Sequence, residues 1–376
     1  MKGRDRLLAQ EVPVIIANMM LGVGTIGLPS RLAEIAGPDG IIAFACAIGV
    51  LVAATVLIIL LVRRFPNQGI ADYSTILIGK VPGFIFNIIF GFFLTCVVAT
   101  MVRGFSEVTK FFLLQRTPLE VIMISMLLAG SLLARNGLQP IARACQILLY
   151  LFLLPLLAIP FFIPIFETGE FLPLFQTDFM SMVKATFGAL FALAGIEVML
   201  VIGSHSEDPK QLMRSSVLTV IAVSVLTGIL VVLAFGSLSV NQVAKLSDPL
   251  FEMIKYVPVP FGIFERVDIF FYTIWIAATY SSVVIGLFTA SHHLAETFKL
   301  ETGKGLVFPC AAASYFLALI PNHEAELGVY GDSLILVWII LVFGVVPLFL
   351  LLSLFRKPKQ SSTKKKQPQK RRANPG

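Results

Sequence analysis

The first long apolar run of this chain carries three glycines and a proline in its second half. From Met19 to Pro29 it reads MMLGVGTIGLP. A continuous membrane helix has no need of these residues, because glycine removes the side chain and weakens the helix. Broken membrane helices release backbone N–H and C=O groups that can hold a small ligand. The segment therefore predicts a discontinuous helix with a transporter-like binding site.

Composition places this segment in a membrane protein. Hydrophobic residues make up 57% of the 376 residues, charged residues only 14%, and the mean hydropathy is +0.89, whereas about a quarter of the residues of a soluble domain are charged. A span needs about 20 mainly apolar residues. The sequence predicts ten such runs, at residues 11–36, 40–62, 83–104, 118–135, 138–166, 179–203, 213–236, 263–291, 304–321 and 329–354.

Basic residues predict the orientation. The run after Lys2, Arg4 and Arg6 contains Glu11 and exceeds the apolar core of a signal peptide, so we interpret it as a retained first span. With ten spans, both termini lie on one side. If that side is the cytoplasm, 21 of the 29 Lys and Arg residues are inside, as the positive-inside rule requires.

The net charge of +7 does not indicate nucleic-acid binding. Much of the basic excess lies between Arg356 and Arg372, which contains no acidic residue. A segment of Lys, Gln, Ser and Pro predicts a disordered cytoplasmic tail near anionic lipid headgroups. It is either a topology determinant or a partner-binding tail. The four Cys and four His residues are too scattered to predict a disulfide framework or a metal site.

An acidic loop, Glu167–Glu170 with Asp178, divides the spans into five and five. Both halves begin with a span that contains glycines, and Gly188 with Gly195 interrupt the sixth. Such paired interruptions indicate an inverted repeat with a site at the midplane. The predicted fold is an all-α polytopic membrane protein with discontinuous helices one and six. Its predicted units are residues 1–166 and 167–355, followed by the tail 356–376.

Several motifs resemble the spore germination permease family, within the amino acid–polyamine–organocation superfamily. The quoted glycine run resembles the first-helix signature of the superfamily, and FGALFALAGIE, residues 187–197, resembles its sixth-helix signature. The turn HSEDPK at 205–210 and the segment ERVDI at 265–269 strengthen the likeness to the permease family. The resemblance implies a germinant-binding B-type subunit acting with A-type and C-type subunits. It also implies a small-molecule pocket between helices one, three, six and eight.

Elementary chemistry suggests how that pocket holds an amino acid. Opened backbone at Gly22, Gly24 and Thr25 offers N–H groups at a half-helix N-terminus, which favours a carboxylate. Carbonyl groups around Leu193 to Gly195 face the ammonium. The alternative for these glycines is close helix packing.

Polar side chains on the same spans complete the predicted ligand site. Glu197 is the only acid in the apolar body of span six, and it binds a cation, relays a proton or braces the broken helix. Thr279 and Ser282 share a helical face, and with Ser281 they resemble the place where sodium-coupled relatives hold sodium. The alternative is that such hydroxyls bond to their own helix. A pocket lined by Phe191, Thr100 and Thr279 suits a small neutral amino acid.

No phosphate-binding loop, nucleophile elbow or metal cluster supports an enzyme or a cofactor. Three functions remain: a ligand-sensing receptor subunit, an ion-coupled secondary amino acid transporter, and a scaffold for partner subunits. The scaffold leaves the glycine breaks unexplained. We favour the sensor on the family resemblance, since fold alone does not separate it from a transporter.

Overall fold

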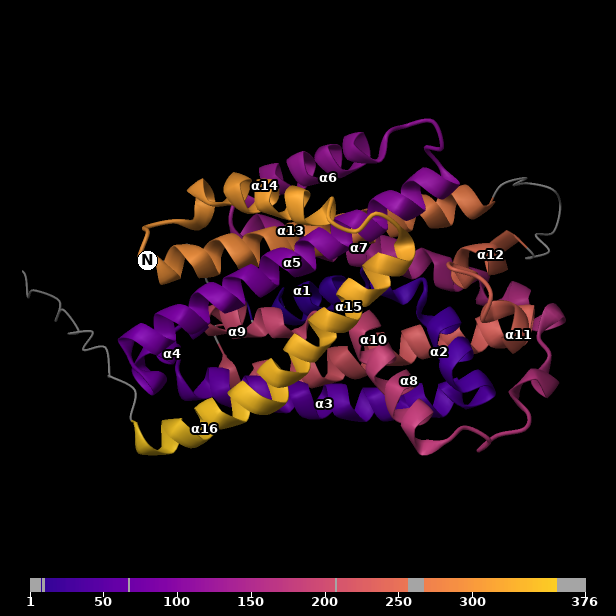
Figure 1. The fold of residues 1–376 in the computed structure, drawn as a ribbon, viewed down its shortest axis with the longest axis horizontal. Coiled ribbons are helices and arrows are strands. Elements are labelled where there is room, and N and C mark those ends of the chain that lie inside the picture. Colours follow the sequence, from indigo (N-terminus) through magenta and orange to yellow (C-terminus); the bar gives the residue numbers. More distant parts are fainter. Residues whose placement is uncertain (1–7, 9–10, 67, 207, 256–266, 357–376) are drawn as a thin grey trace, which may run out of the picture.

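The computed structural model describes residues 8, 11–66, 68–206, 208–255 and 267–356, and every element in these ranges is helical. Ten segments correspond to the predicted runs (Figure 1). They are α1 (Glu11–Met20) with α2 (Leu28–Ala36), α3 (Gly40–Arg64), α5 (Lys80–Phe112), α6 (Leu119–Ala134), α7 (Leu138–Leu153) with η3 (Leu154–Ile165), α8 (Phe179–Ala192) with α9 (Met199–Ile202), α10 (Pro209–Leu238), α13 (Val267–Thr297), α14 (Val307–Ala318), and α15 (Glu324–Ile339) with α16 (Val346–Phe355).

Length and hydropathy agree with an all-α polytopic membrane protein. Within the described residues, six helices are long and apolar enough to cross a membrane, and a seventh span is bent by 55° between α8 and the segment Ile196–His205. Three shorter apolar helices, α1, α6 and α14, complete the set. The predicted run 83–104 was too short, because α5 continues to Phe112 beyond its apolar part and carries Glu107 and Lys110 there.

Short elements cap the two ends of the bundle. The α4 end, at the left of Figure 1, carries α4 (Ile70–Ile78), η6 (Gly203–His205) and the last turn of α16. The opposite end, called the α11 end, carries α11 (Val240–Val243) and α12 (Pro249–Lys255). The remaining short elements are η1 (Val23–Thr25), η2 (Gly37–Asp39), η4 (Thr168–Phe171), η5 (Ile196–Val198), η8 (Gly303–Gly305) and η9 (Ile340–Val345).

Two spans are interrupted near the centre of the bundle, as the glycines of span one and Gly195 predicted. The predicted break at Gly188 was wrong, because Gly188 lies within the continuous helix α8. The first helix stops at Met20 and resumes as α2, with Gly27 before its first residue and Pro29 in its first turn, a position that tolerates proline. The second interruption follows Ala192. Gly195 there has φ +136°, a conformation that L side chains rarely adopt.

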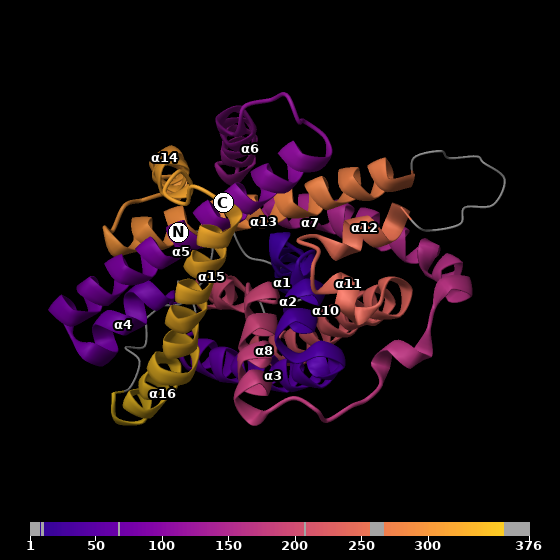
Figure 2. The same ribbon diagram turned by 45° about the vertical axis from the view of Figure 1, so that its right-hand side comes forward.

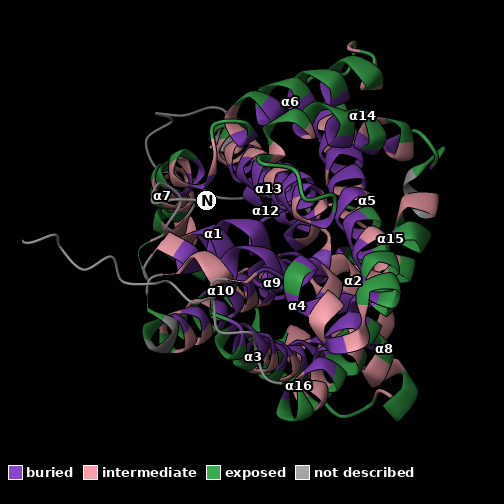
Figure 3. Cartoon of the chain, turned by 90° about the vertical axis from the view of Figure 1, so that its left-hand side faces the viewer, coloured by how far each residue is buried: buried purple, intermediate pink, exposed green. Residues whose placement is uncertain are grey.

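Neighbouring spans hold the interruptions at the core. The α13 helix packs along α5 and against α1, α2 packs against α8, and η1 contacts both α5 and α8. Figure 2 shows α1 and α2 near the centre of the bundle, with α8 beside them toward its lower edge. Buried residues line the interior of the bundle and exposed residues face outward (Figure 3). Because lipid is apolar, these outward faces are hydrophobic as well.

A buried carboxylate anchors the loop between the two halves. Asp39, in the turn between α2 and α3, accepts hydrogen bonds from the backbone N–H groups of Phe175 (2.6 Å), Gln176 (2.8 Å) and Thr177 (2.8 Å). The Thr177 hydroxyl also donates to the Ala36 carbonyl. Charged acceptors make stronger hydrogen bonds than neutral ones. Asp39 therefore fixes the start of α8 relative to the end of α2.

We expect Asp39→Asn to release this loop, since an amide offers one acceptor where the carboxylate offers two. Hydrogen exchange at Phe175, Gln176 and Thr177 is expected to speed up about 10- to 100-fold, as follows from losing hydrogen bonds worth about 1.5–3 kcal/mol each. Asp178→Asn is the matched control, because Asp178 caps only its own helix. Unchanged protection in Asp39→Asn would contradict the anchoring role.

Candidate functional site

A cavity of about 1640 Å³ begins at the two helix interruptions and extends to the α11 end. Gly22 and Gly24 lie on its wall at the first interruption, and Ala192 and Ala194 at the second. Exposed residues such as Lys110, which follow α5 outward, line the wide part. The cavity is therefore accessible from the α11 end.

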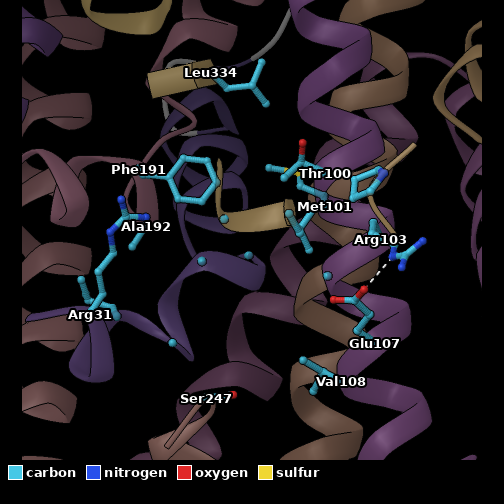
Figure 4. A pocket seen from close by; sticks show the side chains of 18 of the residues that line it. Arg31, Thr100, Met101, Arg103, Glu107, Val108, Phe191, Ala192, Ser247 and Leu334 are labelled. Atoms are coloured by element: carbon cyan, nitrogen blue, oxygen red, sulfur yellow. Dashed lines mark hydrogen bonds and ion pairs between the residues drawn. The ribbon is translucent and has the colours of Figure 1, made fainter. Parts of the chain in front are cut away.

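The deep part of the cavity is apolar. Phe191 of α8 and Thr100 of α5 project toward each other from opposite walls, with Met101 and Leu334 nearby (Figure 4). Other side chains at this level are Met19, Met20, Phe93, Val97, Ile335 and Trp338. Glu197 is the only ionisable group among these deep lining residues.

The opposite side of the interruptions is tightly packed. Every residue of α9, Met199–Ile202, is at most 1% exposed, and Val12, Ile15 and Ile16 of α1 are fully buried. This apolar packing separates the cavity from the α4 end. The structure is thus open at one end and closed at the other, the asymmetry that alternating access requires.

The two interruptions interlock through their glycines. A Cβ on Gly24 would lie 2.8 Å from the Cα of Ala192, and a Cβ on Gly195 would lie 2.7 Å from the Cγ of Met19. Real Cβ atoms do not approach so closely. Both glycines therefore permit backbone contact between the two broken spans, which is the close-packing alternative, while Gly24 also lines the cavity.

Glu197 braces the second interruption. Its Oε2 accepts hydrogen bonds from the Gly195 N–H (2.9 Å) and from Trp338 Nε1–H of α15 (2.9 Å). Its other oxygen, Oε1, is buried without a partner among the described residues. One oxygen thus holds the broken backbone, and the second is buried and unpaired among the described residues, on a residue that lines the cavity.

The start of α2 lies at the cavity wall, where Leu28 and Ser30 carry backbone N–H groups and Pro29 carries none. Gly27, Leu28 and Ser30 line the cavity, and no side chain caps the helix. The first four N–H groups of a helix lack intrahelical partners and carry partial positive charge. A carboxylate is the complementary group for such a position.

Charged pairs surround the wide end. Arg31 of α2 forms an ion pair with Asp332 of α15, so this pair joins the first and tenth spans across the cavity wall. Arg103 pairs with Glu107 at 2.7 Å (Figure 4) and donates to the carbonyls of Ala318 and Asn322. Opposite charges alternate here, so the mouth is polar without a dominant sign.

The hydroxyl groups on spans one, three and eight bond mostly to backbone carbonyls. Thr25 donates to the Gly22 carbonyl and Thr100 to the Cys96 carbonyl. Ser282 donates to the Asn18 carbonyl at 2.8 Å. Thr279 is fully buried and its hydroxyl has no partner among the described residues.

Asn18 occupies the junction between spans one, five and eight. Its Oδ1 accepts from Ser281, and its Nδ2 donates to the carbonyls of Val14 and Cys145. The side chain amide thereby connects α1 to both α7 and α13. Among the described residues, no group of three or more His, Cys, Asp or Glu is placed to hold a metal ion.

The cavity brings together five of the nine predicted site residues, Gly22, Gly24, Thr100, Phe191 and Glu197. Thr25, Gly195, Thr279 and Ser282 lie beside the interruptions but do not line it. Sequence reasoning missed Trp338, Asn18 and the Arg31–Asp332 pair. Trp338 is one of only two tryptophans, and Asn18 is a lone amide in an apolar span, so the sequence marks both as unusual. No sequence pattern indicates that Arg31 pairs with Asp332.

The sequence matches a known protein family and several curated relatives. A family model described as spore germination protein matches residues 6–326. Spore germination proteins YndE and A2 of Bacillus subtilis (strain 168) are each 26% identical, covering 94% and 91% of this chain and 98% and 94% of their own; protein B2 is 23% identical, covering 93% and 95%.

Solved transporters share the fold. Mhp1, a nucleobase-cation-symport-1 family transporter with bromovinylhydantoin bound, superposes with a TM-score of 0.61 at 13% identity, covering 87% of this chain and 75% of its own. MhsT in complex with L-phenylalanine gives a TM-score of 0.58 at 17% identity, covering 94% and 99%.

We expect Gly24→Ala to weaken ligand binding at least tenfold while the protein still inserts, since the new methyl group collides with the backbone at Ala192. Equilibrium binding of a labelled ligand measures this. Gly49→Ala in α3 is the matched control, because a Cβ there meets nothing within 4 Å. Equal affinities in the two variants would remove Gly24 from the site.

We expect Glu197→Ala to lower the free energy of unfolding by about 3 kcal/mol, because the Gly195 and Trp338 donors lose a charged acceptor at about 1–3 kcal/mol each. Glu197→Gln is expected to lose less, since it keeps one acceptor. Unfolding in detergent measures both.

A double-mutant cycle tests the specific bond. Glu197→Ala and Trp338→Phe are expected to be non-additive, as residues sharing a hydrogen bond are. Trp275→Phe is the control, since the Trp275 N–H has no partner among the described residues. If the effects at Glu197 and Trp338 were additive, as those at Glu197 and Trp275 are expected to be, the Glu197–Trp338 hydrogen bond would be refuted.

Proposed function

The chain belongs to the spore germination protein family, and we propose that it is the germinant-binding integral membrane subunit of a spore germinant receptor, with a small neutral amino acid as its ligand. The single observation that supports this most directly is the cavity at the interlocked helix interruptions. It offers unpaired backbone donors and a carboxylate oxygen within an otherwise apolar chamber.

In this proposal the ligand carboxylate binds at the start of α2. Gly27, Leu28 and Ser30 line the cavity there, and the uncapped amides supply donors without a buried cationic side chain. Backbone donors suit an anion in a membrane because they carry no full charge that would need desolvation. Arg31, one residue further, is paired with Asp332, so this pair adds no net charge at the mouth.

The ligand ammonium binds at the second interruption. Glu197 Oε1 has no partner in the described structure, and α8 ends at Ala192, where the carbonyl end of a helix carries partial negative charge. Placing an ammonium beside Glu197 balances a charge that is otherwise costly in the membrane interior. The zwitterion therefore bridges the two broken spans.

The ligand side chain lies against the apolar wall of Phe191, Met101 and Leu334, with Thr100 opposite (Figure 4). This wall has no charged group, so it favours a neutral side chain over a charged one. Apolar pockets distinguish single methylene groups by only about 1–3 kcal/mol. The expected selectivity is therefore graded among neutral amino acids.

The proposal also includes a membrane location and protein partners. We place it in the inner membrane of a bacterial spore, with the α4 end and both termini cytoplasmic, in agreement with the distribution of basic residues. The A-type and C-type receptor subunits are its proposed protein partners, and the bilayer surrounds its apolar faces. A ligand that draws the two interruptions together shifts the conformational equilibrium that those partners read.

Binding and flux measurements on purified protein in liposomes separate this proposal from the alternative, an ion-coupled secondary amino acid transporter. We expect saturable binding of a neutral amino acid from a labelled panel that includes sugars and nucleosides, and no counterflow with or without sodium and proton gradients. Phe191→Ala is expected to weaken that binding about tenfold or more. Phe187→Ala is the control, because Phe187 lies on the same helix and does not line the cavity.

Each outcome is decisive. Counterflow of the bound ligand would make the protein a transporter, whatever its relatives do. Binding of sugars or nucleosides in place of amino acids would refute the ligand class. Absence of any binding, in protein that unfolds cooperatively, would refute a self-sufficient pocket in this subunit.

A further inference from the structure

A second group of ionisable side chains lies at the α4 end, separated from the cavity by the apolar packing of α1 and α9. His292, His293 and Glu296 stand on the last turns of α13, and His205 ends η6. The His205 and His292 ring centroids are 5.3 Å apart. We call these four residues the His–Glu cluster.

Two acceptors face each other inside this cluster. His292 Nε2 lies 3.4 Å from Glu296 Oε1, and neither His292 Nε2 nor Glu296 Oε2 has a hydrogen-bond partner among the described residues. A neutral imidazole with its hydrogen on Nδ1 would direct a lone pair at the carboxylate. A proton on Nε2 converts this repulsion into a charge-assisted hydrogen bond.

The neighbouring histidine is held in its neutral form. His293 Nε2 lies 2.9 Å from the Asn87 carbonyl, so this nitrogen carries the hydrogen and donates it. Its Nδ1 is buried without a partner. Asn87 is itself fixed by Ser74 and by the Ala71 carbonyl of α4. His293 therefore positions α4 and α5 on α13 and leaves His292 as the proton acceptor.

Backbone packs closely around the cluster, so a charged side chain there needs an opposite charge or a proton beside it. A Cβ on Gly69 would lie 2.4 Å from Glu296 Oε2, and one on Gly303 would lie 3.1 Å from the His292 backbone. The segment before α4 and the η8 turn thus press on the cluster from two sides. The other ionisable groups on these two elements and the turn between α13 and η8 are Asp72 and Tyr73 of α4, Lys299, Glu301, and Lys304 of η8. Lys80 of α5 and Arg143 of α7 lie on further helices that pack against α13.

Asp72 adds to the negative charge near Glu296. Burial, and secondly the Glu296 charge, raise the pKa of Asp72 above its ordinary value, while Lys299 opposes this. The α4 end therefore holds two acidic groups, Glu296 and Asp72, close to each other beside the histidines of the cluster. One proton brings the His292–Glu296 pair to zero net charge.

We propose that the His–Glu cluster is a proton-binding site that stabilises the closed α4 end, with the proton held between His292 Nε2 and Glu296. His205 and the Gly69 segment belong to elements that must separate from α13 when this end opens. Opening admits water to Glu296. Water then stabilises the negative charge of the carboxylate, so Glu296 binds the proton less tightly. The closed form therefore binds the proton more tightly than the open form.

The sign of the pH effect follows from this difference. A group that binds a proton more tightly in one state favours that state at low pH. Closure of the α4 end is therefore favoured at lower pH and weakens as the pH rises. The germinant cavity takes no part in this equilibrium, so the inference is independent of the proposed function.

Hydrogen exchange on the full-length protein in lipid nanodiscs, without ligand, tests the proposal. After correction for intrinsic exchange rates, protection of the α9 amides, Met199–Ile202, is expected to fall about tenfold or more between pH 5.5 and 8. Glu296→Gln is expected to abolish this dependence and keep high protection throughout, since an amide donor replaces the proton. His292→Gln is the second variant and is also expected to abolish it.

Two variants serve as controls. His323→Gln alters an exposed histidine at the opposite end that pairs with Glu326, and Asp72→Asn alters the nearby acid on α4. Both are expected to retain the pH dependence. Protection that does not change with pH in the unaltered protein, or a change that persists in both His292→Gln and Glu296→Gln, would overturn the proposal.

Discussion

The contact between the two helix interruptions is the constraint on which the rest of the structure depends. Gly24 lies against the backbone at Ala192, and Gly195 lies against Met19, so each broken span supports the other. Interrupted helices are tolerated in a membrane only where the freed backbone groups are buried in protein or face a polar cavity. The interlock meets both conditions, because one side is packed and the other opens to the cavity.

Buried polar side chains then fix this contact from outside. Glu197 ties Gly195 to Trp338 on the tenth span, and Asn18 ties the first span to the fifth and eighth. Asp39 holds the loop that leads into the sixth span. In a low-dielectric interior such bonds are strong and an unmade one is costly. The arrangement of the broken spans is consequently specific although most of the core is generic aliphatic packing.

Ionisable side chains have different surroundings at the two ends of the molecule. At the α11 end, pairs such as Arg31 with Asp332 lie in contact with water and leave a polar, accessible mouth. At the α4 end, His292 and Glu296 lie under packed backbone with unsatisfied atoms. Charges that water solvates allow access, whereas charges that packing encloses need a proton or a rearrangement. The α11 end is therefore accessible and the α4 end is closed.

The sequence by itself determined the all-α membrane architecture, the positions of the spans, and the interruption of helices one and six. Hydropathy and glycine placement act over a few residues, so local sequence carries them. Only the tertiary structure decided that Gly22, Gly24, Thr100, Phe191 and Glu197 share a cavity wall while Thr279 and Ser282 face packed neighbours. It also decided the partners of Glu197 and His292. Those contacts depend on the rotation of each helix and on residues far apart in the chain, and no local pattern records either.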